Sequence, residues 1–232
     1  MPDSNRPFLK VCGLTRVADM RGAEAAGADF CGLIVEIERS PRRLARQQAR
    51  LLARACRVRP VVVVEDLAPD EIARLVEATG AAAAQLHGGD AAYVRGVAEA
   101  VGEAAELWRP IGLAEEAEDR DAAVERAVGE IEAALDAGAV AIVLDTRTAH
   151  GAGGSGRTCD WEAAAAIVQR CEAPVILAGG LTPRNIAEAL ETTGAAGADL
   201  SSGVEREPGR KCPMLLGELA RAWREVTSRQ TG

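Results

Sequence analysis

Two residues far apart in the sequence carry side chains suited to moving protons. Cys12 follows the run Phe8-Leu9-Lys10-Val11, and Asp145 lies at the end of an apolar run over 140–146. A thiolate can take a proton from carbon, and a buried carboxylic acid with a raised pKa can give one to oxygen. Together they would suit an isomerisation. Each also has a simpler explanation, because Cys12 could be a packed small hydrophobe and Asp145 could cap the loop after it.

The elements that must position these residues form a repeating pattern. Eight short apolar runs each precede a segment whose apolar residues recur with a helical period, and several runs are apolar on both faces, as in parallel strands covered on both sides. The runs cover residues 8–14, 30–36, 59–65, 82–88, 106–113, 140–146, 173–180 and 198–204. Eight such units predict that residues 1–232 form a single α/β domain, a (βα)₈ barrel with eight parallel strands.

In such a barrel the functional site lies at the carboxyl ends of the strands. The interiors of the runs hold Val, Ile, Leu and Ala, whereas their ends hold Cys12, Glu36, Glu65, His87, Asp145, Gly179, Gly180, Ser201, Ser202 and Gly203. A concentration of polar residues at one end predicts a site there. Cys12 and Asp145 end the first and sixth runs, so they are expected on nearly opposite sides of the ring.

Three glycine-rich loops follow the last three runs, at 151–158, 177–185 and 199–205. Glycine lets the backbone approach a ligand closely, and the loops after the seventh and eighth strands are the usual phosphate site of this fold. Thr182-Pro183 predicts a helix start whose free N–H groups favour an anion. The predicted phosphate-binding residues are Gly154, Gly156, Gly179, Gly180, Ser201, Ser202 and Gly203. The loop 151–158 lacks the ending of a P-loop, which disfavours nucleotide hydrolysis.

Composition argues against several functions. The formal net charge is −8 and aromatic residues make up 3% of the chain, which disfavours a nucleic-acid partner. The six cysteines form no C-x-x-C pair and there are two histidines, so no structural zinc site is expected. Neither a signal peptide nor a membrane-spanning run is expected. These features favour a cytoplasmic protein with free thiols.

Seven stretches, in order along nearly the whole chain, resemble the phosphoribosylanthranilate isomerase family. They are "KVCGLT" (10–15), "SPRR" (40–43), "QLHG" (85–88), "VLDT" (143–146), "GGSGRTCDW" (153–161), "ILAGGLTPRN" (176–185) and "DLSSGVEREPG" (199–209). The resemblance implies a single (βα)₈ barrel that carries out an Amadori rearrangement in tryptophan biosynthesis. The substrate would be N-(5-phosphoribosyl)anthranilate and the product 1-(2-carboxyphenylamino)-1-deoxyribulose 5-phosphate, with no metal or cofactor. Members of the family are monomers or homodimers.

The resemblance also implies roles for single residues. Asp145 would be the general acid that opens the ribose ring, and Cys12 the general base that removes the proton from C2. Arg42 matches a family arginine near the anthranilate carboxylate, and a guanidinium can hold a carboxylate with two parallel hydrogen bonds. His87 and Asp199 match further substrate-binding positions. Arg42 is expected to contribute to binding and little to stability.

Some positions depart from the family pattern around the expected anthranilate site. The chain has Val35, Glu36 and Glu38 before "SPR", Glu65 after the third run, and Arg109 in the fifth. Extra carboxylates would weaken the binding of an anion unless arginines offset them. Two alternatives therefore stay open. One is a related isomerase acting on another phosphorylated aminoaldose, and the other is a phosphosugar-binding barrel without catalysis, against which the presence of both Cys12 and Asp145 argues.

Overall fold

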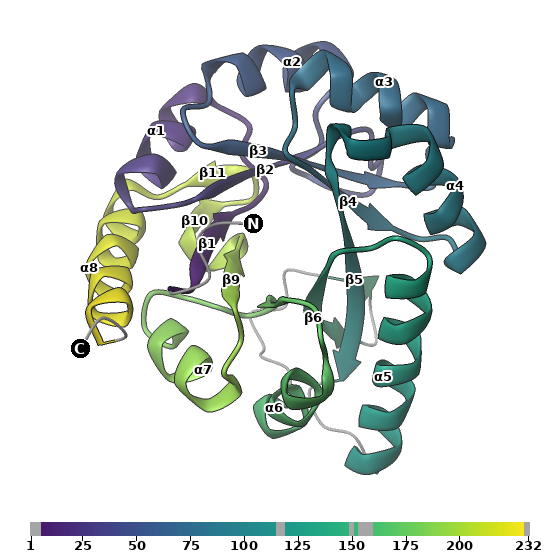
Figure 1. Ribbon diagram of the computed structural model, residues 1–232. Coiled ribbons are helices and arrows are strands. Elements are labelled where there is room, and N and C mark those ends of the chain that lie inside the picture. Colours follow the sequence, from purple (N-terminus) through teal and green to yellow (C-terminus); the bar gives the residue numbers. More distant parts are fainter. Residues whose placement is uncertain (1–5, 115–118, 149–150, 153–159, 230–232) are drawn as a thin grey trace.

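The computed structural model describes residues 6–114, 119–148, 151–152 and 160–229, and its central feature is a closed ring of eight parallel strands (Figure 1). The ring closes because β1 pairs with both β2 and β9, and β5 pairs with both β4 and β6. Its strands are β1 (Phe8–Val11), β2 (Phe30–Ile34), β3 (Arg59–Glu65), β4 (Ala83–His87), β5 (Glu106–Ala114), β6 (Ala141–Thr148), β8 (Val175–Leu177) and β9 (Gly197–Leu200). The predicted barrel is confirmed, with one strand in each of the eight apolar runs.

In the described part of the chain, eight α-helices surround this ring (Figure 1). They are α1 (Val17–Ala25), α2 (Arg46–Ala55), α3 (Pro69–Thr79), α4 (Ala91–Val101), α5 (Arg120–Asp136), α6 (Trp161–Arg170), α7 (Ile186–Thr193) and α8 (Pro213–Arg229). Each turns an apolar stripe toward the strands; in α3 the residues Ile72, Leu75 and Val76 are buried, as their helical spacing predicts. Smaller elements are η1 (Gly102–Ala104), β7 (Gly151–Ala152), η2 (Ser202–Val204), β10 (Glu205–Glu207) and β11 (Arg210–Lys211).

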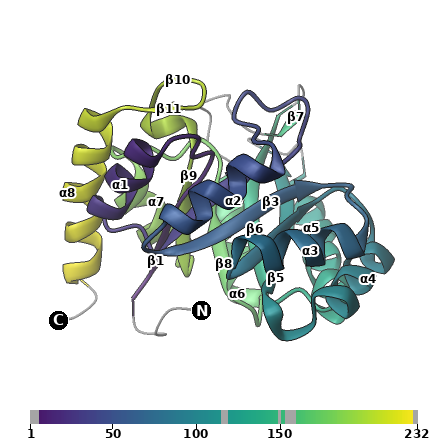
Figure 2. The same cartoon turned by 90° about the horizontal axis from the view of Figure 1, so that it is seen from above.

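The short elements mark the end of the barrel at which function was expected. Strand β7 folds back on β6, and β10 and β11 form a hairpin soon after β9. Figure 2 shows β7 and this hairpin at the same end of the barrel, opposite the two termini. Both follow the carboxyl ends of barrel strands, so the segments that border the predicted site gather on one face.

The predicted start of α7 at Thr182-Pro183 is wrong by about one turn, because the helix begins at Ile186. Asn185 accounts for the difference. Its Oδ1 accepts a hydrogen bond from the Thr182 backbone N–H at 2.7 Å, and its Nδ2 donates to the Gly180 carbonyl at 3.2 Å. These bonds close a turn over 183–185 before the helical backbone starts.

The barrel interior is layered because alternate residues of a strand point to the same side. At the amino ends of the strands, Phe8, Phe30 and Trp108 pack edge to face, with ring centroids 5.4 Å apart for Phe8–Phe30 and 4.8 Å for Phe30–Trp108. Two residues after Phe8, the same inward side carries Lys10, and two further on it carries Cys12. The apolar base therefore gives way to polar side chains toward the carboxyl ends.

Candidate active site

Cys12 is held rigidly where β1 ends. Its backbone N–H donates to the Leu200 carbonyl at 2.8 Å, and its side chain is 7% exposed. On the other side Gly32 of β2 leaves room for the thiol, since a Cβ at that position would lie 2.7 Å from Cys12 Sγ. Burial is the main reason why the pKa of the thiol is raised above its ordinary value. The thiol is thus packed, as in the simpler explanation, but packed among charged neighbours.

Asp145 lies within β6 and is partly buried. Its pKa is raised from 3.8 to about 6, first because burial removes the carboxylate from water and second because the carboxylate of Asp199 is near. The Lys10 ammonium and the Thr146 backbone N–H act in the opposite direction. A carboxyl group with this pKa keeps a proton far more often near neutral pH than an ordinary aspartate, so Asp145 suits the role of an acid.

Three buried polar residues, Lys10, Gln85 and Asp199, lie beneath these two groups and are called here the polar floor. Lys10 Nζ donates to Asp199 Oδ2 at 2.5 Å and to Gln85 Oε1 at 3.0 Å, and the Lys10 side chain is fully buried. The floor joins β1 to β9 and also to β4 on another part of the ring. Charges in this network influence both Cys12 and Asp145, because Lys10 and Asp199 act on the pKa of each.

His87 extends this network at the end of β4. With the Gln85 amide oriented to accept from Lys10, Gln85 Nε2 donates to His87 Nε2 at 3.1 Å, so the ring hydrogen is on Nδ1. Burial, followed by the nearby Lys10 charge, lowers the pKa of His87 to about 4. The imidazole is therefore neutral at physiological pH and can donate one hydrogen bond. The structure brings His87 and Asp199, both predicted to bind substrate, into one network.

Two buried polar atoms at this end have no hydrogen-bond partner among the described residues, namely Asp199 Oδ1 and Thr146 Oγ1. Buried polar groups in native proteins are nearly always satisfied, so unpartnered ones indicate positions that a ligand or water completes. Thr146 also approaches Gly179 so closely that a Cβ on Gly179 would overlap its hydroxyl. Gly179 is therefore required for packing against β6, in addition to any role toward a ligand.

The loops after β8 and β9, which hold five of the predicted phosphate-binding residues, pack closely against each other. Gly179 and Gly180 have φ of 80° and 63°, a left-handed backbone that favours glycine. Gly203 lies so close to the Leu181 carbonyl that any side chain there would overlap it. Ser201 Oγ donates to the Cys12 carbonyl at 3.2 Å, which places this loop beside the thiol. Ser202 begins η2 directly afterwards. The predicted Gly154 and Gly156 lie outside the described residues.

Comparisons with known proteins agree with this geometry. The family model described as N-(5'-phosphoribosyl)anthranilate (PRA) isomerase matches residues 9–220. The chain belongs to the PRA isomerase family. A curated N-(5'-phosphoribosyl)anthranilate isomerase from Methanopyrus kandleri is 38% identical over 225 residues, covering 94% of this chain and 99% of that protein. The enzyme of the same name from Halobacterium salinarum is 39% identical over 213 residues, covering 88% of this chain and 89% of its own.

Solved structures of PRA isomerases share the barrel. The one from Thermotoga maritima superposes with a TM-score of 0.80 at 27% identity, covering 95% of this chain and all of that one. The one from Thermococcus kodakaraensis gives a TM-score of 0.77 at 30% identity, covering 94% of this chain and 99% of its own. The sequence comparisons show the family, and the structural comparisons show the same barrel.

Arg42, the residue that resembles the family's carboxylate-binding arginine, already holds a carboxylate of the chain itself. Its Nε and Nη2 donate to the two oxygens of Glu205 at 2.9 and 2.7 Å. Glu205 is 4% exposed at its side chain and also accepts from Lys211 Nζ at 2.8 Å. The stem of Arg42 lies over Gly13, where a Cβ would overlap it. The Arg42 guanidinium is therefore part of a partly buried ion pair, next to the residue that follows Cys12.

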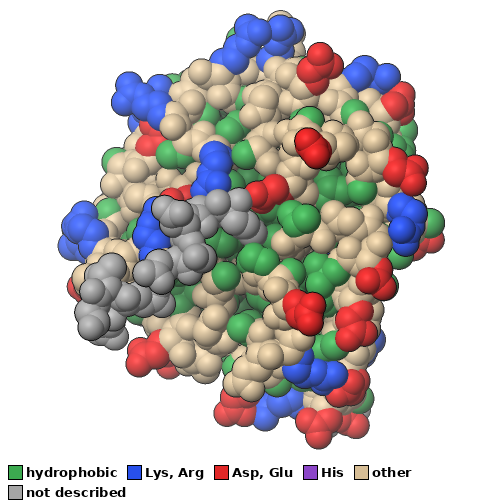
Figure 3. All heavy atoms as spheres, viewed as in Figure 1, with side chains coloured by type: hydrophobic (Ala, Val, Ile, Leu, Met, Phe, Trp, Pro, Cys, Tyr) green, Lys and Arg blue, Asp and Glu red, His purple; other side chains and the backbone are tan. Residues whose placement is uncertain are grey.

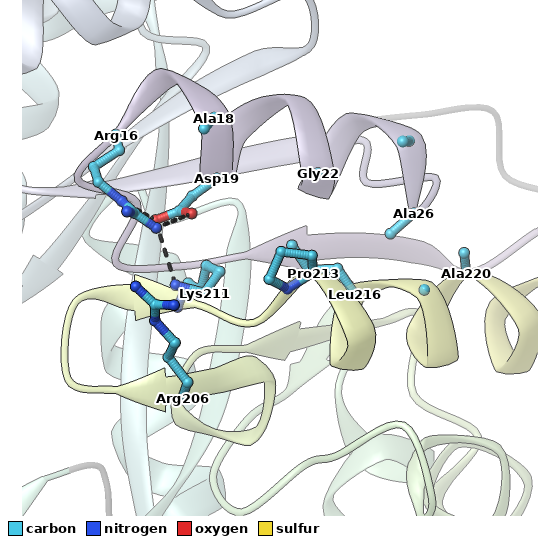
Figure 4. A pocket seen from close by; sticks show the side chains of 12 residues that line it. Arg16, Ala18, Asp19, Gly22, Ala26, Arg206, Lys211, Pro213, Leu216 and Ala220 are labelled. Atoms are coloured by element: carbon cyan, nitrogen blue, oxygen red, sulfur yellow. Dashed lines mark hydrogen bonds and ion pairs between the residues drawn. The ribbon is translucent and has the colours of Figure 1, made fainter.

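Glu205 and Lys211 were missed by sequence reasoning, although Glu205 lies within the quoted stretch 199–209 and Lys211 follows two residues after it. Lys211 Nζ also donates to the Ser201 carbonyl at 3.0 Å, and its side chain is fully buried. The Lys211 backbone N–H donates to Asp19 Oδ2 at 3.3 Å, and Arg16 pairs with the same carboxylate at 2.6 Å (Figure 4). Asp19 thereby fastens the β10–β11 hairpin to α1, along a groove between α1 and α8.

The departures from the family pattern are compensated locally. Each extra carboxylate pairs with an arginine, as Glu36–Arg46, Glu38–Arg43 and Glu65–Arg39, although Arg46 also pairs with Glu71. Arg109 instead donates to backbone carbonyls at the end of β4 and in the loop after it, at 3.0 Å to Leu86 and 2.8 Å to Gly89. The added negative charge is thus neutralised where it arises, which removes the main physical objection to an anionic substrate.

Arg42→Ala is expected to weaken both binding and folding, contrary to the expectation from sequence that it affects stability little. Glu205 would lose two of its donors while buried, so the free energy of unfolding should fall by about 1–3 kcal/mol. The KM for an anionic substrate should rise about tenfold or more. Steady-state kinetics and urea unfolding measure the two effects.

Arg43→Ala is the matched control for this prediction, because the neighbouring Arg43 pairs with Glu38 in solvent, with side chains 53% and 83% exposed. It should change stability by less than about 0.5 kcal/mol and leave KM near the parent value. Equal free energies of unfolding for Arg42→Ala and the parent would show that the Arg42–Glu205 pair does not contribute to stability.

Proposed function

We propose that this PRA isomerase family member converts N-(5'-phosphoribosyl)anthranilate into 1-(2-carboxyphenylamino)-1-deoxyribulose 5-phosphate, with Asp145 as general acid and Cys12 as general base. The observation that carries the assignment of roles is the different environment of the two groups around one polar floor. Asp145 has a pKa of about 6 and so retains a proton readily. Cys12 has the Lys10 ammonium beside it, which favours the thiolate.

The proposed steps move only protons and electron pairs within the substrate. Asp145 gives its proton to the ring oxygen, and the bond from that oxygen to C1 breaks as the anilinic nitrogen forms a protonated Schiff base. The Cys12 thiolate then takes the proton from C2. The electrons of that C–H bond form a C1=C2 double bond and neutralise the nitrogen. The resulting enolamine becomes the ketone when C1 gains a proton and the C2 hydroxyl loses one, and transfer of the proton on Cys12 back to Asp145 through solvent restores the starting enzyme. No electron acceptor is needed.

Residues around the pair supply the proposed binding contacts. The substrate phosphate would lie on the loops after β8 and β9, where Gly180 and Ser202 present backbone groups. The unpartnered Asp199 Oδ1 and the neutral His87 face the same end and suit sugar hydroxyl groups. Arg42 would meet the anthranilate carboxylate by exchanging part of its contact with Glu205, which keeps Lys211 as a partner.

Turnover of phosphoribosylanthranilate generated in situ tests this function directly. The substrate fluoresces, so its loss upon addition of the purified protein reports isomerisation. Loss of fluorescence with appearance of the deoxyribulose product is the expected result. Absence of turnover while inorganic phosphate still protects the protein against unfolding would contradict the proposal. That result would favour another phosphorylated aminoaldose as substrate, or a binding barrel without catalysis.

The proposed function also includes a cellular location and a set of partners. Among the described residues no helix is long and apolar enough to cross a membrane. On the face seen in Figure 3, acidic and basic side chains are interspersed around apolar ones without a continuous basic area. We infer that residues 1–232 act as one domain in the cytoplasm on a small phosphosugar, without a cofactor, a nucleic-acid partner or a membrane partner. A PRA isomerase structure from Thermotoga maritima is described as dimeric, and this chain would be a monomer or homodimer.

A further inference from the structure

Lys10 is a fully buried lysine in the middle of the barrel, in a strand whose other residues are apolar. Burying an ammonium group is strongly unfavourable unless charged and hydrogen-bonding partners compensate for it. The partners here are Asp199 Oδ2 at 2.5 Å and Gln85 Oε1 at 3.0 Å. An ion pair alone would be a structural feature, so the question is why this pair lies directly beneath the thiol.

An ammonium group has three N–H bonds, and the polar floor accepts two of them. The third is not engaged by the floor, and residues 10 and 12 project to the same side of the chain, so the ammonium charge lies near the Cys12 thiol and favours its thiolate. Asp199 and Gln85 come from β9 and β4, so they hold the ammonium from two directions. Lys10 is therefore immobilised on the side of the barrel interior to which Cys12 also projects.

We propose that Lys10 is a positioning residue that holds the Cys12 sulfur as a thiolate at the moment when Cys12 removes the proton from C2. This deepens the proposed function and depends on it for the identity of the base. Lys10 gives up no proton in the step; Cys12 changes from thiolate to thiol while Lys10 and Asp199 stay charged. Substrate does not reach Lys10, since the residue is fully buried below Cys12.

The other charges around Cys12 make this role necessary. Burial and the Asp199 carboxylate both disfavour the Cys12 thiolate. The neighbouring Cys31 on β2 carries no positive charge that could offset them. Lys211, from β11, is a second cation near the sulfur, but its ammonium is engaged by Glu205 at 2.8 Å. Lys10 is the cation that favours the thiolate most strongly, and without it the remaining near charge from the floor would be the repelling carboxylate.

The test compares the ultraviolet titration of the Cys12 thiolate in matched pairs of proteins. Subtracting the Cys12→Ala spectrum from that of the parent isolates Cys12 from the other cysteines, and the same subtraction is made in the Lys10→Met background. The pH at which half of Cys12 is ionised should rise by about one unit or more in Lys10→Met. At any given pH below that midpoint, the thiolate fraction should therefore be at least about tenfold smaller than in the parent. Lys10→Arg keeps the cation and should stay within a few tenths of a pH unit of the parent.

A second pair of variants is used if Lys10→Met leaves the Asp199 carboxylate unpaired and thereby unfolds the barrel. Asp199→Asn removes that charge, and Lys10→Met in the Asp199→Asn background should still raise the midpoint relative to Asp199→Asn alone. An unchanged midpoint in folded Lys10→Met protein, or in the Asp199→Asn pair, would show that Lys10 has only a structural role.

Kinetics of the same variants complete the test. Lys10→Met should lower kcat for phosphoribosylanthranilate about tenfold with KM nearly unchanged, and Lys10→Arg should recover most of the loss. A loss confined to KM would overturn the proposal. The titration needs no substrate, so failure of the Lys10 proposal is distinguishable from failure of the proposed function, which the turnover assay reports separately.

Discussion

Replacing Cys12 with alanine is expected to lower kcat for phosphoribosylanthranilate by about 100- to 10,000-fold, the range over which a general base accelerates a proton transfer. Alanine removes the sulfur and leaves the barrel otherwise intact, because the Cys12 backbone stays bonded to Leu200. The remaining activity would come from water acting as a weak base in a site that still binds substrate. Single-turnover measurements with enzyme in excess report the chemical step and separate it from product release.

Cys171→Ala is the control for this substitution. Cys171 is a free, partly buried cysteine at the end of α6, outside the candidate site. It should lower kcat by less than about twofold, as expected for a substitution away from the chemistry. Full activity in Cys12→Ala would contradict the proposed mechanism. A comparable loss in Cys171→Ala would indicate that removing a thiol acts through the fold.

Asp145→Asn is expected to abolish most activity and at the same time to stabilise the protein at neutral pH. The folded protein binds a proton to Asp145 more tightly than the unfolded chain does, since its pKa is about 6 in place of 3.8. The stability that this contributes is therefore present below the unfolded value and is lost as pH rises through the folded value. Asparagine does not ionise, so Asp145→Asn should gain about 1–3 kcal/mol relative to the parent at neutral pH.

Urea unfolding at about pH 4.5 and pH 7.5 measures this difference. The gain of Asp145→Asn over the parent should be larger at the higher pH and small at the lower one. Asp160→Asn is a suitable control, because the pKa of Asp160, unlike that of Asp145, is lowered in the folded state. It should lose stability at the higher pH. A pH-independent difference for Asp145→Asn would contradict the raised pKa.

The same two groups predict the shape of the pH–rate profile. The active form has protonated Asp145 together with ionised Cys12, although the pKa of the acid is about 6 and that of the thiol lies above its ordinary 9. Below about pH 6 the acid is already protonated while the thiolate fraction falls about tenfold per pH unit. Above it, loss of the acid offsets the gain of thiolate. The kcat/KM should therefore rise up to about pH 6 and then stay level until the thiol ionises.

Asp145→Asn identifies the group responsible for the break. Its residual kcat/KM should lack the break near pH 6 and should continue to rise with the thiolate fraction. Persistence of the break would assign it to another group, for which His87 is a poor candidate because its pKa is about 4. The presence or loss of this break therefore tests whether Asp145 is the general acid, without an assumption about which residues bind the substrate.

Local sequence patterns were sufficient for the fold and for selecting the two groups that are proposed to react. Runs of Val, Ile and Leu followed by helical periods predicted each barrel strand, and the carboxyl-end rule then selected Cys12 and Asp145. These inferences depend on the alternation of side chains along one strand, which a single stretch of sequence contains. The late start of α7 shows the limit of this approach, because the Asn185 side chain closes a turn ahead of the helix.

The charges that surround the reacting groups were decided by tertiary structure alone. Lys10 lies in "FLKV", where a lysine within an apolar strand was a signal that sequence reasoning left unused. Its partners Gln85 and Asp199 are 75 and 189 residues away in the chain. Arg42 likewise meets Glu205 across 163 residues. Burial and Coulomb interactions depend on distance in space, so the pKa values and the pairing of charges arise only when the closed ring brings distant strands together.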